Sequence, residues 1–139
     1  MKIRTILIVL GCALVAAGCS NVTTRIAPNA NLAQHKRIYV EHRLADGRDL
    51  DGLIAQDLRA RGYDASSGPM TLMPRDTELV VSYADQWAWD FNWYMNTLDI
   101  AVRAARTDKG LATVHCNRPS AAFGSPPTVM IHDVLSKLF

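Results

Sequence analysis

Alternation of large apolar residues with small or polar ones dominates the second half of this chain. It runs through residues 78–89 and again through 96–106, and residues 111–117 form a third candidate strand. The large residues of the first segment are Leu79, Val81, Tyr83, Trp87 and Trp89, with Asp85 the exception in their parity. A period of two is that of a β-strand with one buried face. Short connections at 90–93 and 107–110 therefore predict an antiparallel meander.

Two segments have the apolar spacing of an amphipathic helix instead. Residues 49–62 carry an apolar stripe, with acidic residues near the start and basic residues near the end. The stripe consists of Leu50, Leu53, Ile54 and Leu58. Asp49 and Asp51 suit the positive N-terminal end of such a helix. Residues 128–139 form a second stripe after two prolines, which are tolerated where a helix begins.

Two further strands complete the predicted domain. Residues 36–41 are rich in β-branched and aromatic side chains, and residues 63–65 form a short strand after the first helix. The resulting order is β-α-β-β-β-β-α. It predicts a single α+β domain over residues 36–139, a two-layer sandwich with a mainly antiparallel sheet and both helices on one face.

The N-terminus has the three parts of an export signal. Lys2 and Arg4 give a positive start, residues 6–15 form an apolar run, and residues 16–18 are small. The apolar run is far shorter than the roughly 20 residues that span a bilayer. We therefore expect a cleaved leader over residues 1–18, followed directly by Cys19.

The residues around the cleavage point resemble a known signal. Residues 14–19, Leu-Val-Ala-Ala-Gly-Cys, resemble the lipobox of bacterial lipoproteins. The resemblance implies that the Cys19 thiol carries diacylglycerol, whereas plain secretion would leave it as a thiol. No Asp follows Cys19, which by resemblance to enterobacterial sorting implies an outer membrane, with the protein facing the periplasm. Residues 19–35 are predicted to be the lipidated N-terminus and a flexible tether.

Charge and cysteine content limit the remaining possibilities. Losing Lys2 and Arg4 with the leader leaves 13 basic and 13 acidic residues, so no nucleic-acid partner is expected. The product has about 121 residues, the size of one domain. With Cys12 removed and Cys19 acylated, only Cys116 remains, and an intramolecular disulfide is excluded in the lipidated form. Cys116 is either a buried small apolar residue or an intermolecular or reactive thiol.

All three tryptophans lie within residues 83–94, together with Phe91 and two tyrosines. One interpretation makes these rings core and a brace for a hairpin. The other makes them an exposed surface that docks a partner, stacks on a sugar or touches a membrane. The candidate contact residues are Trp87, Trp89, Trp93 and Tyr94. The pattern Tyr-x-Asp-x-Trp-x-Trp-Asp at 83–90, within a match over residues 78–112, resembles small Gram-negative lipoproteins of unassigned function, and it brings no catalytic residues.

Catalytic and metal-binding signatures are absent from the sequence. It has no phosphate-binding loop, and the adjacent His115 and Cys116 would face opposite sides of a strand. The four histidines, at positions 35, 42, 115 and 132, lack recognisable ligand spacing, so no metal or cofactor is expected. We therefore predict a non-enzymatic, membrane-anchored envelope lipoprotein that binds or supports another envelope component, with an envelope protein as its expected partner. The alternative is a cell-wall glycan or small-ligand binding protein or hydrolase that uses Asp85 and Asp90 beside stacking tryptophans.

Overall fold

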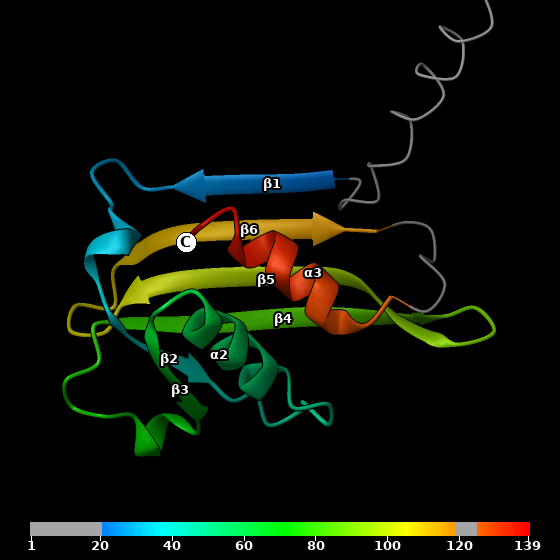
Figure 1. Cartoon of the computed structure of the whole chain (residues 1–139), viewed down its shortest axis with the longest axis horizontal. Helices are drawn as coiled ribbons and strands as arrows, with labels where there is room; N and C mark the ends of the chain where they lie inside the picture. Colours follow the sequence, from blue (N-terminus) through cyan, green and yellow to red (C-terminus); the bar gives the residue numbers. More distant parts are fainter. Residues whose placement is uncertain (1–20, 119–124) are drawn as a thin grey trace, which may run out of the picture.

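The computed structural model describes residues 21–118 and 125–139, which form a mixed six-stranded sheet and two helices (Figure 1). The strands are β1 (Asn21–Ile26), β2 (Arg37–Glu41), β3 (Asp64–Gly68), β4 (Leu79–Trp89), β5 (Trp93–Ala104) and β6 (Gly110–Asn117). The helices are α2 (Leu50–Ala60) and α3 (Pro127–Leu135), with short 3-10 turns η1 (Leu32–Gln34) and η2 (Met70–Leu72). The predicted α+β class is confirmed.

The sheet is antiparallel on one side and parallel on the other. Its order is β1-β6-β5-β4-β2-β3, and the pairings from β1 to β4 are antiparallel, as the alternation predicted for the last three strands. β2 pairs in parallel with both β3 and β4. The β2–β3 pairing follows from the α2 crossover between them, because parallel neighbours need a long connection. The sequence did not identify these two parallel pairings.

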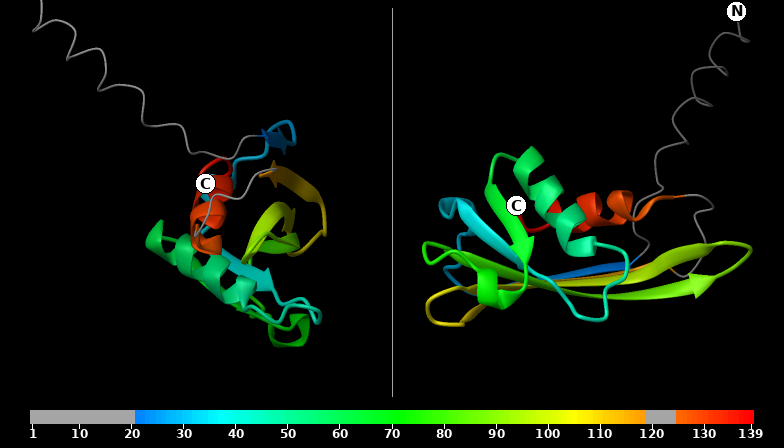
Figure 2. Two further views of the ribbon diagram at one scale, coloured as in Figure 1. Left: turned by 90° about the vertical axis from the view of Figure 1, so that its right-hand side faces the viewer. Right: turned by 90° about the horizontal axis from the view of Figure 1, so that it is seen from below.

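Both helices cover the same face of the sheet (Figure 2). In α2, the stripe residues Leu50, Ile54 and Leu58 are completely buried, while Leu53 is partly exposed. α3 contributes four buried residues, Met130, Ile131, Val134 and Leu135. They pack on the large residues that alternate along β4, β5 and β6. Within the described ranges, no helix has both the length and the apolar character that crossing a bilayer requires.

The predicted tether over residues 19–35 is wrong for most of its length. Residues 21–26 form β1, which pairs with β6 along six residues, and Leu32 in η1 is only 4% exposed. β1 has hardly any buried side chain, because it is an edge strand with both faces largely open. Its stability comes from backbone hydrogen bonds to β6, and these leave no periodic pattern in the sequence.

A β-bulge interrupts the β4–β5 pairing near the hairpin. Gln86 pairs with Thr97, but Trp87 pairs with Met95, so Asn96 is an extra residue on β5. A bulge of this kind changes which face the following side chains occupy. Met95 therefore joins Leu98 in the core although their separation of three residues breaks the strand period.

Candidate functional site

The first half of the aromatic motif, which we define as residues 83–94, contacts the loop between β2 and α2, residues 42–49. The Tyr83 hydroxyl donates a hydrogen bond of 2.6 Å to Asp46 Oδ2. Asp46 also accepts the backbone N–H groups of Arg48 and Leu50, at 2.7 and 2.8 Å. Asp46 thus satisfies one of the N–H groups that a helix leaves unpaired at its start. The sequence predicted acidic residues at this positive end of the helix, and Asp51 does lie in its first turn. Asp49 precedes the helix with a left-handed backbone (φ 57°) and makes no side-chain cap bond.

These contacts shift the pKa values of the two side chains in opposite directions. Burial opposes ionisation of Asp46, but the hydrogen bonds from Tyr83, Arg48 and Leu50 outweigh it, so its pKa is lowered. Burial, followed by the bond to the Asp46 carboxylate, raises the pKa of Tyr83. The pair is therefore an ionised carboxylate and a neutral phenol at neutral pH, which is the state in which the hydrogen bond forms.

Asp85 and Trp87 continue the same set of contacts. Asp85 Oδ1 lies 2.5 Å from the Arg43 guanidinium, and Asp85 Oδ2 accepts the Trp87 indole N–H at 2.7 Å. The Arg48 guanidinium lies 4.0 Å from the centre of the Trp87 ring. Asp85 and Trp87, two of the predicted contact residues, are thus engaged with residues 42–49. We call Tyr83, Asp85 and Trp87 the loop clamp.

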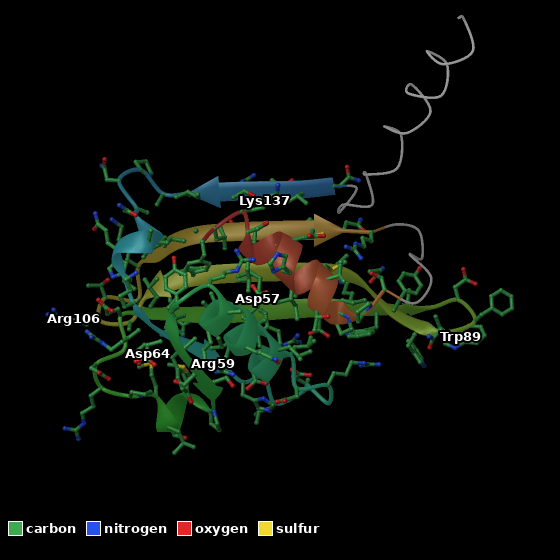
Figure 3. The ribbon with its side chains drawn as sticks, viewed as in Figure 1. Asp57, Arg59, Asp64, Trp89, Arg106 and Lys137 are labelled. Atoms are coloured by element: carbon green, nitrogen blue, oxygen red, sulfur yellow. The ribbon has the colours of Figure 1, made fainter. Side chains whose placement is uncertain are left out.

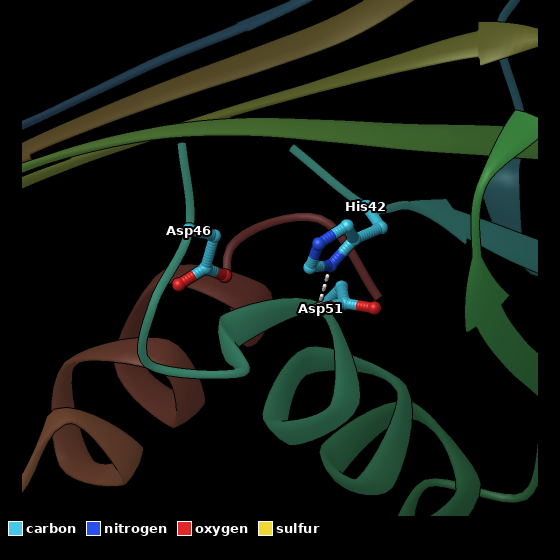
Figure 4. A group of neighbouring side chains, drawn as sticks. All are labelled: His42, Asp46 and Asp51. Atoms are coloured by element: carbon cyan, nitrogen blue, oxygen red, sulfur yellow. Dashed lines mark hydrogen bonds and ion pairs between the residues drawn. The ribbon is translucent and has the colours of Figure 1, made fainter. Parts of the chain in front are cut away.

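His42, the first residue of this loop, forms a polar pair with Asp51 of α2 (Figure 4). His42 Nδ1 lies 2.9 Å from Asp51 Oδ1, and Asp51 is only 4% exposed. The hydrogen bond to Asp51 raises the pKa of His42, and burial opposes it only in part. The sequence did not connect these two residues, because they lie nine positions apart on different elements. No local spacing could have revealed the pair.

His42, Asp46 and Asp51 offer one ligand atom each, and these atoms lie within 4.8 Å of one another. Among the described residues this is the single group of three with such proximity. Asp46 already accepts three hydrogen bonds, and Asp51 is bonded to His42. These hydrogen bonds fix the position of residues 42–49. They account for the proximity of the three side chains without a need for a metal ion.

The second half of the aromatic motif extends beyond the helix layer and is exposed. Trp89 and Trp93 form the last pair of the β4–β5 ladder and are 63% and 57% exposed. Phe91, in the turn between them, is 86% exposed, and its ring centre lies 6.3 Å from that of Trp89. Figure 3 shows Trp89 at the far end of the hairpin. The interpretation as core is wrong here, since no helix or loop among residues 21–118 and 125–139 buries these rings. We call Trp89, Phe91 and Trp93 the aromatic tip.

The other predicted site residues are distributed over both halves. Tyr94 pairs with Ala88 and is half-buried, whereas Asp90 is exposed in the turn of the aromatic tip. Asp85 faces Arg43 and Trp87 inside the loop clamp. The two carboxylates therefore have different surroundings and no common partner among the described residues. Phe91 was missed by the sequence, although its position between two tryptophans in a turn was a usable signal.

Cys116 is completely buried in β6 and is disulfide-bonded. Its partner lies outside the described residues, as does Cys19. The sequence excluded an intramolecular disulfide only for the lipidated form. Lipidation would remove Cys12 and acylate Cys19, which are the two possible intramolecular partners. Acylation of Cys19 and a disulfide between Cys19 and Cys116 are therefore mutually exclusive.

Solved structures with the same fold include a PelC dodecamer from Paraburkholderia phytofirmans. That chain is 18% identical with a TM-score of 0.62, over 85% of this chain and 98% of the other. A DUF4136 family protein from Bacteroides thetaiotaomicron is 10% identical with a TM-score of 0.54, over 84% and 92% of the two chains. No protein-family model and no curated protein matches the sequence. At these identities the likeness establishes the fold alone.

Proposed function

We propose that this protein is a lipid-anchored component of the bacterial cell envelope, on the periplasmic side of an outer membrane, with a non-catalytic binding or structural role. Its contact surface is the aromatic tip. The observation that carries the proposal is positional: β1 begins at the end of the sheet from which the β4–β5 hairpin projects (Figure 1). The proposed anchor, Cys19, precedes the first residue of β1 by only two positions.

The pairing register supports this arrangement. Asn21, Asn117, Thr97 and Gln86 form one row across β1, β6, β5 and β4. The hairpin runs three residues past this row on β4, about 10 Å at the rise of a β-strand. Two residues of extended chain between Asn21 and Cys19 span at most about 7 Å. A lipid on Cys19 would therefore enter a membrane on the side toward which the aromatic tip points.

The composition of the aromatic tip suits such a position. Tryptophan is enriched at membrane–water interfaces, where its ring is buried and its N–H remains hydrated. Phe91 occupies the left-handed region with φ 56°, which costs a side chain about 1–2 kcal/mol, and it packs on no core residue. Phe91 therefore contributes little to folding. Insertion of the rings would add a second membrane attachment beside the lipid, which stable anchoring requires when few acyl chains are present.

Two independent measurements test the proposal. The first is mass spectrometry of the protein processed in a Gram-negative host. Acylation at residue 19 with residues 1–18 removed supports the anchor. A retained leader, or residue 19 joined by a disulfide to Cys116, contradicts it.

The second measurement is tryptophan fluorescence in vesicles whose phospholipids are brominated near the headgroup. We expect strong quenching in the wild type. The Trp89→Phe/Trp93→Phe variant should lose most of it, since the reporters are removed while the rings stay apolar. Trp87→Phe is the matched control and should keep the quenching. Equal quenching in all three proteins would contradict membrane contact by the aromatic tip, whatever the state of Cys19.

A further inference from the structure

At the end of the sheet opposite the aromatic tip lies a hollow of about 610 Å³. It is bounded by the start of β2, the β3–β4 loop and the β5–β6 turn. Its charged lining residues are His35, Arg37, Arg75, Asp76, Glu78 and Arg106. The Ala105 N–H donates a hydrogen bond of 2.9 Å to the Glu78 carbonyl, which joins the two loops. Figure 3 shows Arg106 and Trp89 at opposite ends of the molecule.

The two acidic residues of the hollow already have partners. Glu78 Oε2 accepts the backbone N–H groups of Lys36 and Arg37, both at 2.9 Å. These two bonds lower the pKa of Glu78 and outweigh burial, which raises it. The Arg37 guanidinium lies 3.4 Å from the Asp76 carboxylate and 3.7 Å from that of Glu78. His35 Nδ1 also lies 3.7 Å from Glu78 Oε1. The lining holds three arginines and two carboxylates, a net charge of +1 with His35 neutral, and neither acid contacts Arg75 or Arg106.

Arg75 and Arg106 are exposed and lack a partner. Of the arginines in residues 21–118, three have a side chain with no hydrogen bond, ion pair or ring contact: Arg25, Arg75 and Arg106. Two of these three line the same hollow, on separate loops. Two like charges facing one hollow repel each other, and an anion between them would reverse the sign of that interaction. The planar guanidinium is also the side chain best suited to bind carboxylate or phosphate oxygens in pairs.

We propose that this hollow binds an oxyanion, a phosphate or carboxylate group of a larger ligand, between Arg75 and Arg106. The volume falls within the roughly 300–1,000 Å³ usual for ligand pockets. No phenylalanine, tyrosine or tryptophan among the described residues lines the hollow, so recognition rests on charge and hydrogen bonds. That the site faces away from the membrane rests on the proposed function. The site itself does not, and it would survive a failure of the lipid anchor.

The test is a titration of the processed protein, in detergent, with inorganic phosphate and separately with citrate at constant ionic strength. Backbone amide shifts of Thr77 and Thr107, which also line the hollow, report binding by NMR. We expect saturable binding at about millimolar ligand or below. Arg75→Gln and Arg106→Gln should each weaken binding about tenfold, the effect of losing a charge-assisted hydrogen bond.

Arg25→Gln is the matched control, because Arg25 is the other unpartnered arginine and lies outside the hollow. It should bind within about twofold of the wild type, as expected for a distant, screened charge. Tighter binding of phosphate or of citrate identifies the chemical source of the natural ligand. An unsaturable response to both anions, or equal weakening by Arg25→Gln, would overturn the proposal.

Discussion

The loop clamp and the aromatic tip are halves of one short motif, yet the first is covered by other parts of the chain and the second is exposed. Tyr83, Asp85 and Trp87 all bind residues 42–49, and Tyr83 is only 5% exposed. Trp89 has the same parity on the same strand but is 63% exposed. The difference is due to what lies above the strand. The loop between β2 and α2 covers β4 as far as Trp87, and beyond that point nothing in the described chain covers it.

The comparison separates residues kept for folding from residues available for contact. A ring that buries little surface adds little to stability, because the hydrophobic gain scales with apolar area removed from water. The loop clamp should therefore carry a large free energy of folding, and the aromatic tip almost none. Each of the following predictions sets one half against the other.

The largest expected effect is at Tyr83. Tyr83→Ala should lower the free energy of unfolding by about 3–5 kcal/mol, since it removes a buried ring and a partner of Asp46. Trp93→Ala in the aromatic tip should change it by less than about 0.5 kcal/mol. Urea denaturation followed by circular dichroism measures both. Equal destabilisation by the two variants would remove the distinction between clamp and tip.

The two aspartates of the motif should differ in the same way. Asp85→Ala leaves the Arg43 guanidinium and the Trp87 indole N–H without their partner, which should cost about 1–2 kcal/mol. Asp90→Ala, in the exposed turn, should stay within about 0.5 kcal/mol of the wild type. Thermal unfolding of both variants gives the comparison. A larger loss at Asp90 than at Asp85 would show that the turn holds the hairpin more strongly than the loop clamp does.

At Phe91, one substitution should have opposite effects on stability and on membrane binding. Phe91→Gly relieves a left-handed side chain, and after the added freedom of the unfolded chain a gain of up to about 1 kcal/mol is expected. The same variant should bind vesicles less well than the wild type. Chemical denaturation and vesicle co-sedimentation test the two effects together. A loss of stability would mean that the Phe91 ring packs on something essential to the fold.

The smallest effect expected is a pH dependence from His42, the first residue of the loop. Because the bond to Asp51 raises the pKa of His42 above its ordinary 6.5, the protonated form is favoured in the folded state. The contribution of this bond to the free energy of unfolding is complete below pH 6.5. It is lost as the pH rises through the raised pKa of His42 in the folded state. The unfolding temperature of the wild type minus that of His42→Gln should therefore shrink from pH 5.5 to 8.5. A difference that is constant with pH would contradict stabilisation of the folded state by the bond between protonated His42 and Asp51.

The sequence predicted the parts of the fold that depend on neighbours along the chain. The alternation over residues 78–117 gave three strands in the right places, and the stripe of Leu50, Ile54 and Leu58 gave α2 and its buried face. These patterns are local, because the strand and helix periods are properties of a few consecutive residues. The cleaved leader and the lipidation of Cys19 were also inferred from consecutive residues, and both remain predictions.

Only the tertiary structure decided which chain segments cover one another. It placed Asp46 at the start of α2, divided the tryptophans into covered and exposed, and brought Arg75 and Arg106 to one hollow. It also turned the expected tether into β1, which is held by backbone hydrogen bonds to residues some 90 positions away. Such contacts join residues far apart in sequence, where side-chain periodicity carries no information about the partner. Parity identified the face of Trp89, and the extent of the layer above that face determined its exposure.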